Sequence, residues 1–212
     1  MPQPAIALTF DDGPNTVITP QVLDLLEEYG AAASFFLIAQ NITPESAEVV
    51  RRAKAMGCDI ENHSLTHGHM DQMSREQILS EVKACTDQIV AITGEAPSFF
   101  RPPFIDVSRE MYDSIDLTFI CGVGCEDWVP TVTAQERAAR VLANAEDGQI
   151  VLLHDMQWNQ ATVDALKVIL PELKNRGYRF VTVSRLFREK NVTPRRGWLY
   201  SNVLQADSDS RL

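Results

Sequence analysis

The sequence predicts an α/β domain, a (β/α) barrel with about seven parallel strands. Two observations lead to this fold. Short apolar runs alternate with longer amphipathic stretches along most of the 212 residues, which is the pattern of strands joined by helices over a parallel sheet. Polar residues suited to catalysis follow several successive apolar runs. The strand ends of a closed barrel all converge on one mouth, whereas an open sheet gathers its ligands at a single switch point, so a barrel is favoured.

Strands are predicted at the short apolar runs, and helices at the amphipathic stretches between them. The expected strands are Ala5–Phe10, Ala33–Leu37, Asp59–Glu61, Ser98–Arg101, Thr118–Cys121, Ile150–Leu153 and Arg179–Thr182. The expected helices are Pro20–Tyr29, Pro44–Met56, Ser74–Ile92, Ser108–Ile115, Ala134–Ala145 and Asn159–Arg176. Ser74 and Gln77 form a capping box, and a glycine follows the last turn of most of these helices.

Residues 1–205 are expected to form a single domain, because they are long enough for one hydrophobic core and contain no internal repeat. Residues 206–212 are rich in Ser and Asp and are expected to be a disordered tail. The net charge of −10 argues against nucleic acid or an anionic membrane as a partner. No apolar run is long enough for a transmembrane helix. We expect a monomer that acts on a neutral substrate.

The cysteines and the N-terminal residues give information about where in or outside the cell the protein is found. The four cysteines, Cys58, Cys85, Cys121 and Cys125, form no CxxC pair, and buried thiols are expected rather than disulfides. The first residues show no charged segment followed by an apolar run, so no signal peptide is expected. A catalytic module cut from a larger protein would look the same. The location is then extracellular or at the cell surface for such a module, and cytoplasmic for a complete chain.

Two adjacent carboxylates, Asp11 and Asp12, follow the first strand in the segment Thr9–Pro14. Like charges this close raise each other's pKa, and a fold tolerates them when a cation lies beside them. Adjacent side chains that leave a strand point to opposite sides. One carboxylate could therefore bind a metal while the other stands over the metal-bound water. A turn or a helix cap explains one aspartate here, but not two.

His63 and His67 follow the third strand at a spacing that places two imidazoles one helical turn apart. The ordinary alternative is a pair of surface or capping histidines. No glutamate base stands between them, so this is not the zincin motif. With a carboxylate from another strand end they make a two-His, one-carboxylate set, which is a catalytic pattern because it leaves coordination positions open for water or substrate.

Arg101 ends the fourth strand and is followed by Pro102, Pro103 and Phe104. A surface arginine is the ordinary alternative. In a site that holds two carboxylates, however, the guanidinium would pair with one of them and keep it ionised. The two prolines stiffen the loop and remove amide donors, so the Phe104 N–H could face a developing oxyanion.

His154 ends the sixth strand, and Asp127 and Trp128 follow the fifth. A histidine at such a strand end is often only a buried, hydrogen-bonded residue. Asp127 could hold His154 as an imidazolium, which suits a general acid. Trp128 and Leu152 are either core residues or the walls of a small apolar pocket. His69 is expected to face away from His67 and is given no role.

Five segments in this order resemble the motifs of the polysaccharide deacetylases, the NodB-homology group also called carbohydrate esterase family 4. They are Thr9–Pro14, His63–His67, Arg101–Phe104, Asp127–Trp128 and Leu152–His154. The resemblance covers nearly the whole chain. The first two motifs at this spacing are specific together, whereas the other three are weak alone.

The resemblance implies a distorted (β/α) barrel and an enzyme that removes acetyl groups from an acetylated polysaccharide or oligosaccharide. It implies a divalent metal, zinc first and cobalt or nickel as alternatives. In the roles it implies, metal ligands are Asp12, His63 and His67; catalytic residues are Asp11 as base, Arg101 as its partner, His154 as acid and Asp127 as its orienting group; substrate-binding residues are Phe104, Trp128 and Leu152.

Three departures from the family pattern stand out. Phe104 replaces a usual Tyr, Ile105 replaces a frequent Gly, and Gly124 stands where an Asp is common. The surrounding residues resemble the acetylxylan esterase branch more than the peptidoglycan branch. Acetylated xylan, chitin oligomers and peptidoglycan all stay open as substrates.

Two other functions stay open as alternatives. A two-His, one-carboxylate site can hold iron for oxygenase chemistry, but such an enzyme has no use for Asp11 as a base or for Arg101 beside it. A carbohydrate-binding pseudoenzyme could retain the fold, but every catalytic position of this chain is filled.

Overall fold

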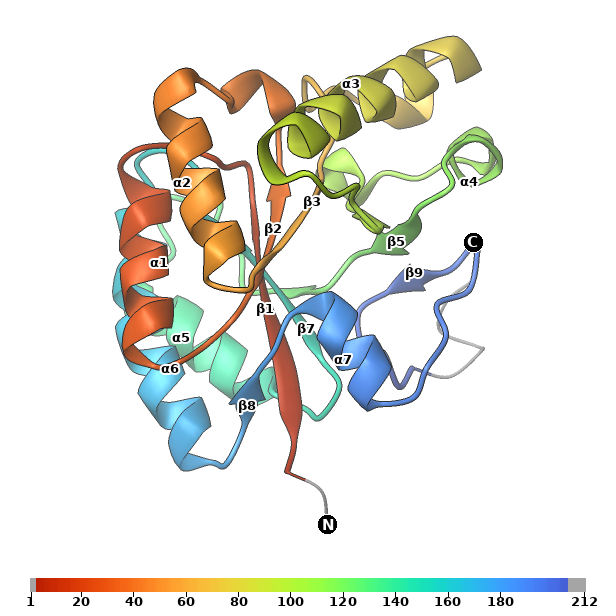
Figure 1. Cartoon of the computed structure of the whole chain (residues 1–212). Helices are drawn as coiled ribbons and strands as arrows, with labels where there is room; N and C mark the ends of the chain where they lie inside the picture. The colour runs from red at the N-terminus through yellow and green to blue at the C-terminus, as the bar shows by residue number, and fades with distance from the viewer. Residues whose placement is uncertain (1–2, 206–212) are drawn as a thin grey trace.

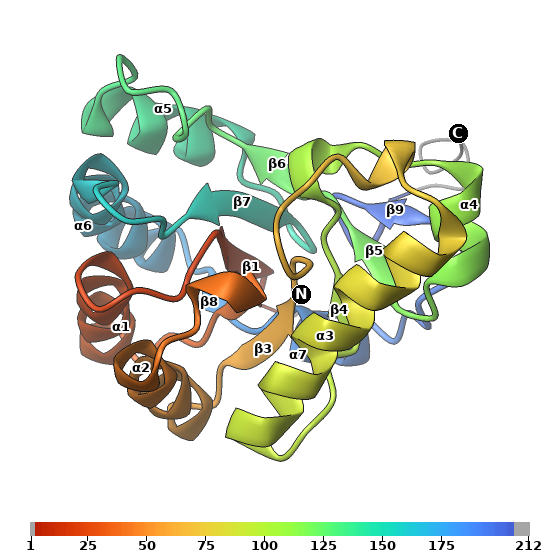
Figure 2. The same ribbon diagram turned by 90° about the horizontal axis from the view of Figure 1, so that it is seen from above.

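The fold is a sheet of parallel strands curled into a barrel, with helices around its outside (Figures 1 and 2). The structure is a computed structural model that describes residues 3–205; the tail predicted over residues 206–212 lies outside them. The strands are β1 Ala5–Asp11, β2 Ser34–Leu37, β3 Asp59–Asn62, β4 Phe99–Phe100, β5 Thr118–Ile120, β6 Val123–Gly124, β7 Ile150–His154, β8 Arg179–Phe180 and β9 Leu199–Tyr200.

Helices α1 to α6 cover the outside of the barrel, and a seventh helix, α7, follows β8. They are α1 Ile18–Glu28, α2 Pro44–Ala55, α3 Arg75–Thr93, α4 Arg109–Ser114, α5 Ala134–Asn144, α6 Gln160–Asn175 and α7 Val183–Glu189. Three short 3₁₀ turns, η1 Ala39–Asn41, η2 Met70–Gln72 and η3 Pro103–Ile105, lie in loops after β2, β3 and β4. The capping box predicted at Ser74 and Gln77 is present at the start of α3.

The sheet runs in the order β6-β7-β1-β2-β3-β4-β5-β9, with β8 beside the start of β1, and all of these pairings are parallel. The segment after β9 reaches back to β7, where the Ile150 N–H donates to the Ser201 carbonyl at 3.0 Å and the Val203 N–H to the Gly148 carbonyl at 2.8 Å. This C-terminal segment bridges the gap between β5 and β7. The predicted barrel is confirmed, with an irregular closure.

The two faces of β1 show how the barrel is packed. Ile6, Leu8 and Phe10 pack outward in the cluster that contains the buried faces of the helices. Ala5 and Ala7 alternate with them and belong to the cluster that fills the barrel, together with Phe36, Phe99, Ile120, Ile150 and Tyr200. Because side chains alternate along a strand, the same inner face continues through Thr9 to Asp11. The strand period therefore carries Asp11 to the mouth of the barrel.

Helix α7 closes the end of the barrel opposite the mouth, beside β8 and the start of β1 (Figure 1). Its Val183, Leu186 and Phe187 are buried in the inner cluster, and the Phe187 ring lies 5.7 Å from that of Phe99 and 4.9 Å from that of Tyr200. The inner cluster is thus apolar at this end, and the polar residues lie at the other.

All seven predicted strands and all six predicted helices are present, with ends that differ by no more than two residues. Helix α7 and the strands β6 and β9 were not predicted, because two-residue strands and a seven-residue helix carry too little periodicity. The four cysteines are free, as expected, and three of them are buried. Within residues 3–205, no helix is both long and apolar enough to cross a membrane.

We expect Phe187→Ala to lower the free energy of unfolding by about 3–5 kcal/mol, because it empties the apolar plug of the barrel. Denaturation in urea measures this change. The matched control is Arg188→Ala, an exposed neighbour on the same helix, which should change stability by no more than about 0.5 kcal/mol. An equal effect of the two changes would show that α7 does not contribute to the core.

Candidate active site

Asp11 ends β1 and Asp12 is the first residue of the loop that follows. Asp12 has a left-handed backbone, with φ 70°, and its carbonyl accepts a hydrogen bond from Asn41 Nδ2 at 2.9 Å. The two carboxylates were expected to point to opposite sides, and this expectation is wrong. Asp11 Oδ2 lies 3.6 Å and Asp12 Oδ1 3.5 Å from the same atom, His63 Nε2, because the positive φ turns the chain at Asp12.

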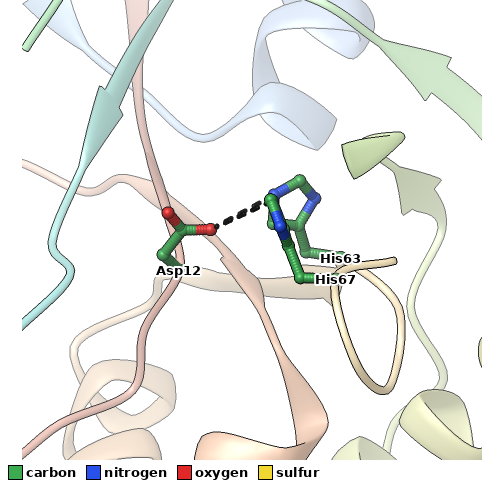
Figure 3. A group of neighbouring side chains, drawn as sticks. All are labelled: Asp12, His63 and His67. Carbon is green, nitrogen blue, oxygen red and sulfur yellow. Dashed lines mark ion pairs between the residues drawn. The ribbon is translucent and has the colours of Figure 1, made fainter. Parts of the chain in front are cut away.

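His63 and His67 lie in the loop between β3 and η2, not on a helix, so the expected helical turn between them is wrong. Ser64 and His67 have left-handed backbones, with φ 70° and 59°, and Glu81 of α3 accepts hydrogen bonds from loop residues. The tight loop still brings the two imidazoles together, with ring centres 4.8 Å apart. His67 Nε2 lies 3.5 Å from Asp12 Oδ1, and the three side chains converge from the loops after β1 and β3 (Figure 3).

The donor atoms of these three residues fit a divalent cation. His63 Nδ1 lies 2.6 Å from the Arg101 carbonyl; a carbonyl only accepts, so Nδ1 carries the proton and Nε2 presents a lone pair toward Asp12. Asp12 Oδ1 is buried and has no hydrogen-bond donor among the described residues. One ligand atom from each of Asp12, His63 and His67 lies within 4.8 Å of the others. Two imidazole nitrogens and one carboxylate oxygen are a set that zinc and similar ions bind.

The charge states also suit a cation site. Burial raises the pKa of Asp12, but the nearby imidazoles, that of His63 first, lower the pKa more, so the net shift is downward. Burial, aided by the charge of His63, lowers the pKa of His67 despite the neighbouring aspartates. Near neutral pH Asp12 is therefore ionised and His67 is neutral, the forms in which each binds a metal.

Arg101 is completely buried and pairs with Asp11. Its Nη1 lies 2.5 Å from Asp11 Oδ1, and the guanidinium lies over the Phe36 ring at 4.2 Å from the ring centre. The alternative of a surface arginine is therefore wrong. Gly122, with φ +85°, makes room for this pair: a Cβ there would lie 3.1 Å from Arg101 Nη2.

His154 ends β7 and is held by Asp127. Its Nδ1 and its backbone N–H each lie 2.7 Å from a carboxylate oxygen of Asp127, which also accepts from Thr162 Oγ1 at 2.8 Å. Burial lowers the pKa of His154, but the hydrogen bond and charge of Asp127, with the charges of Asp11 and Asp12, raise it to about 9. His154 is therefore protonated at neutral pH.

The three predicted substrate-binding residues lie at the mouth with different exposure. Phe104 is 54% and Trp128 49% exposed, whereas Leu152 is buried. Phe104 packs between two histidines, with its ring centre 4.6 Å from that of His67 and 4.1 Å from that of His69. His69 was expected to face elsewhere and in fact stacks on Phe104. The Trp128 ring stands edge-on to His154 at 5.5 Å.

Asp155 is a buried carboxylate beside the site that the sequence reasoning missed. Its Oδ2 accepts a hydrogen bond from Thr19 Oγ1 at 2.5 Å, and its carboxylate fills the space next to Gly13, where a Cβ would lie 2.6 Å from Oδ2. Burial first, and then the charges of Asp12 and Asp11, raise the pKa of Asp155 to about 7. A carboxylate directly after the strand end at His154 was the signal that could have found it.

Sequence comparison places the chain among known proteins. Residues 1–119 match the family model described as polysaccharide deacetylase. The chain is 47% identical over 202 residues to a bifunctional xylanase/deacetylase of Pseudobutyrivibrio xylanivorans, covering 95% of this chain and 33% of that protein. It is 34% identical over 186 residues to the peptidoglycan-N-acetylglucosamine deacetylase PgdA of Listeria monocytogenes, covering 87% and 39%. The chain thus spans well under half the length of these relatives.

Solved structures show the same likeness over whole domains. The Xyl-CE4 domain of a multidomain xylanase from the hindgut metagenome of Trinervitermes trinervoides superposes with a TM-score of 0.93 at 44% identity, covering 95% of this chain and 98% of that one. A family 4 acetyl xylan esterase from Clostridium thermocellum, in complex with a cobalt ion, superposes with a TM-score of 0.92 at 39% identity, covering 95% and 100%.

We expect Asp127→Asn to lower the pKa of His154 by at least about one unit, because it removes the charge that opposes burial. The measurement is an NMR titration of the His154 ring, with Asp164→Asn, an exposed aspartate on α6, as the control. The pKa of His154 is raised to about 9 in the folded state from the ordinary 6.5. The protonated ring therefore stabilises the fold, fully below about pH 6.5, and this contribution to stability is lost as the pH rises through 9. An unchanged pKa in Asp127→Asn would contradict this account.

Proposed function

Because the chain belongs to the polysaccharide deacetylase family, we propose that it is a metal-dependent hydrolase that removes acetyl groups from an acetylated polysaccharide or oligosaccharide. Membership confirms the resemblance found in the five motifs. The observation that carries the proposal is one constellation: Asp12, His63 and His67 converge as a set that could hold a metal ion, next to the buried Asp11–Arg101 pair. The His154–Asp127 pair lies at the same end of the barrel, because His154 is the partner of Asp11 in the register of β7 and β1.

Asp12, His63 and His67 would hold the divalent cation, for which we propose zinc, with cobalt or nickel as alternatives. When bound, such an ion polarises an acetyl carbonyl and makes a water molecule more acidic. His63 is oriented for this role by the Arg101 carbonyl, and Asn41 holds the Asp12 backbone. Fixed ligands of this kind need no rearrangement before the ion binds.

Asp11 is proposed as the general base. Arg101 holds its Oδ1, and its Oδ2 faces the cation site, 3.6 Å from His63 Nε2. Because the guanidinium occupies Oδ1, Oδ2 is the oxygen left to accept the proton of the attacking water. Arg101 is then a positioning residue, because it is completely buried and acts through Asp11.

His154 is proposed as the general acid that protonates the departing sugar oxygen or nitrogen. Asp127 accepts a hydrogen bond from the His154 Nδ1–H, which leaves the Nε2–H to donate its proton to the leaving group. The Phe104 N–H is proposed as a donor to the oxyanion, where one such donor is worth roughly 3 kcal/mol. Trp128 and Leu152 would enclose the acetyl methyl group.

Acetylxylan is the substrate class that we put first. Two of the proteins similar to this chain carry xylanase in their names and one is an acetyl xylan esterase, whereas others are peptidoglycan deacetylases. Acetate release from acetylxylan, N-acetylglucosamine oligomers and peptidoglycan tests the proposal. No release from any of the three would overturn it.

Removal of the metal should abolish acetate release, and added zinc or cobalt should restore it. His67→Ala should weaken zinc binding by roughly 100-fold or more, because it removes one of three protein ligands. Zinc titration followed by calorimetry measures this, with Asp164→Ala, an exposed aspartate on α6, as the control outside the site. Activity that survives a chelator would contradict the metal-dependent mechanism.

Asp11→Asn should reduce acetate release by about 10²–10⁴-fold while zinc stays bound, because the amide cannot accept the proton of water. Acetate release and zinc content are measured on the same preparation. The change also leaves the Arg101 charge unpaired, so the assay is run below the melting temperature of the variant. Loss of zinc in step with activity would make Asp11 a metal ligand and not the base.

A further inference from the structure

A buried arginine lies behind the His154–Asp127 pair. Arg137 is on α5, which packs beside α6 on the outside of the barrel (Figure 2), and only 2% of the residue is exposed. A buried guanidinium is costly unless its N–H groups and its charge are met by neighbouring groups. No step proposed for Asp11, His154 or the cation ligands involves this residue, so its contacts must show why the fold keeps a charge there.

Every nitrogen of the Arg137 guanidinium donates a hydrogen bond. Nε donates to the Val132 carbonyl at 2.9 Å, and Nη2 donates to the Val129 carbonyl at 3.3 Å. Nη1 donates to Asn159 Oδ1 at 2.6 Å and to Thr162 Oγ1 at 3.0 Å. All four of these acceptors within residues 3–205 are neutral. The side chain is therefore fully hydrogen-bonded, while its charge is met by no carboxylate among these partners.

The two acceptors of Arg137 Nη1 both lead on to His154. Thr162 Oγ1 accepts from the guanidinium and donates to Asp127 Oδ2 at 2.8 Å. The same carboxylate holds the His154 ring at Nδ1. On the other side, Asn159 Oδ1 accepts from the guanidinium, and Asn159 Nδ2 donates to the His154 carbonyl at 3.0 Å. One guanidinium therefore fixes the His154 ring through one arm and the His154 backbone through the other.

The charges along the first arm alternate in sign. Asp127 lies between the protonated ring of His154, which it contacts directly, and Arg137, which is one hydroxyl away. Asp127, Thr162 and Arg137 are each no more than 2% exposed, and charges interact more strongly in such a site than in water. Arg137 is therefore a positive charge that stays near Asp127 when the ring of His154 becomes neutral.

This charge matters for a residue that has to release a proton. While the His154 ring is an imidazolium, it balances the carboxylate of Asp127. Once the proton has left, a buried carboxylate without a nearby cation would be costly, and that cost would hold the proton on the ring. Because Arg137 interacts with Asp127 in both states of the ring, it lowers this cost.

We propose that Arg137 is a positioning residue of the general acid, which orients His154 through the two arms and balances Asp127 after the ring has released its proton. The inference rests on the proposed function, in which His154 protonates the departing sugar oxygen. The Nε2 proton passes to that oxygen as its bond to the acyl carbon breaks. The bonding electron pair stays on the oxygen, and the ring is left neutral.

The test compares two acetyl esters whose leaving groups differ in basicity. The sugar oxygen of acetylated xylo-oligosaccharides needs a proton to leave, whereas 4-nitrophenolate leaves without one. Arg137→Met should lower the ratio of kcat for the oligosaccharides to kcat for 4-nitrophenyl acetate by about 10- to 100-fold, since losing a general acid outright typically costs about 10²–10⁴-fold. Arg137→Lys keeps the charge and should recover part of the ratio. Arg188→Met, at an exposed arginine on α7, is the control and should keep the ratio.

Two changes at Thr162 test the arm to Asp127 without touching the arginine. Thr162→Val removes the hydroxyl that joins Arg137 to Asp127 at nearly constant volume, and it should lower the same ratio. Thr162→Ser supplies a hydroxyl again and should recover most of the ratio. This pair decides the result if Arg137→Met does not fold.

A ratio that falls in Arg137→Met and recovers in Arg137→Lys supports the inference, as does a fall in Thr162→Val that Thr162→Ser reverses. An unchanged ratio overturns it, even where both activities fall together, because a merely structural residue affects the two esters alike. Unmodified protein that releases no acetate from any acetylated glycan contradicts the proposed function, and this inference then fails with it. Active unmodified protein with an unchanged ratio in the variants contradicts this inference alone.

Discussion

The buried pair of Arg101 and Asp11 is the interaction on which the site depends. A guanidinium inside a barrel is costly to bury unless a carboxylate meets it, and Asp11 is on the inner face of β1 because side chains alternate along that strand. The same arginine also uses its carbonyl to fix His63. The pair therefore sets the position of the proposed base and of one cation ligand at once. The pair also requires a glycine at position 122, since the Cβ of any other residue there would press against the guanidinium.

The barrel separates stability from chemistry along its axis. The end closed by α7 is filled with apolar side chains such as Phe99, Phe187 and Tyr200, and this packing contributes free energy without placing constraints on the mouth. The mouth can then keep features that cost energy, including adjacent carboxylates and left-handed backbones at Asp12, Ser64 and His67. Such features persist only where the surrounding structure determines them fully, and here the strands and Glu81 of α3 do so.

The parts predicted from the sequence are those that follow from periodicity or from residue chemistry. The strand period places Asp11, and a carboxylate beside Arg101 in one site implies a pair. The sequence could not reveal what depends on a tight loop: His63 and His67 meet through left-handed turns rather than a helix, and Asp12 faces the same way as Asp11. Asp155 was missed for a related reason: its position after His154 was visible in the sequence, but its neighbours Gly13 and Thr19 lie far earlier in the chain.

The proposed acid and base are coupled through charge, and this bears on how the site would work. Asp11 and Asp12 help to raise the pKa of His154 to about 9, which is high for a residue that must give up its proton near neutral pH. A divalent cation beside Asp12 would offset that negative charge, and the pKa of His154 would fall toward the working range. In the proposed mechanism, the site thus becomes a better acid only when its cation is bound. In that mechanism the adjacent carboxylates would serve both steps of the reaction, because they would attract the cation and would also make the acidity of His154 depend on whether it is bound.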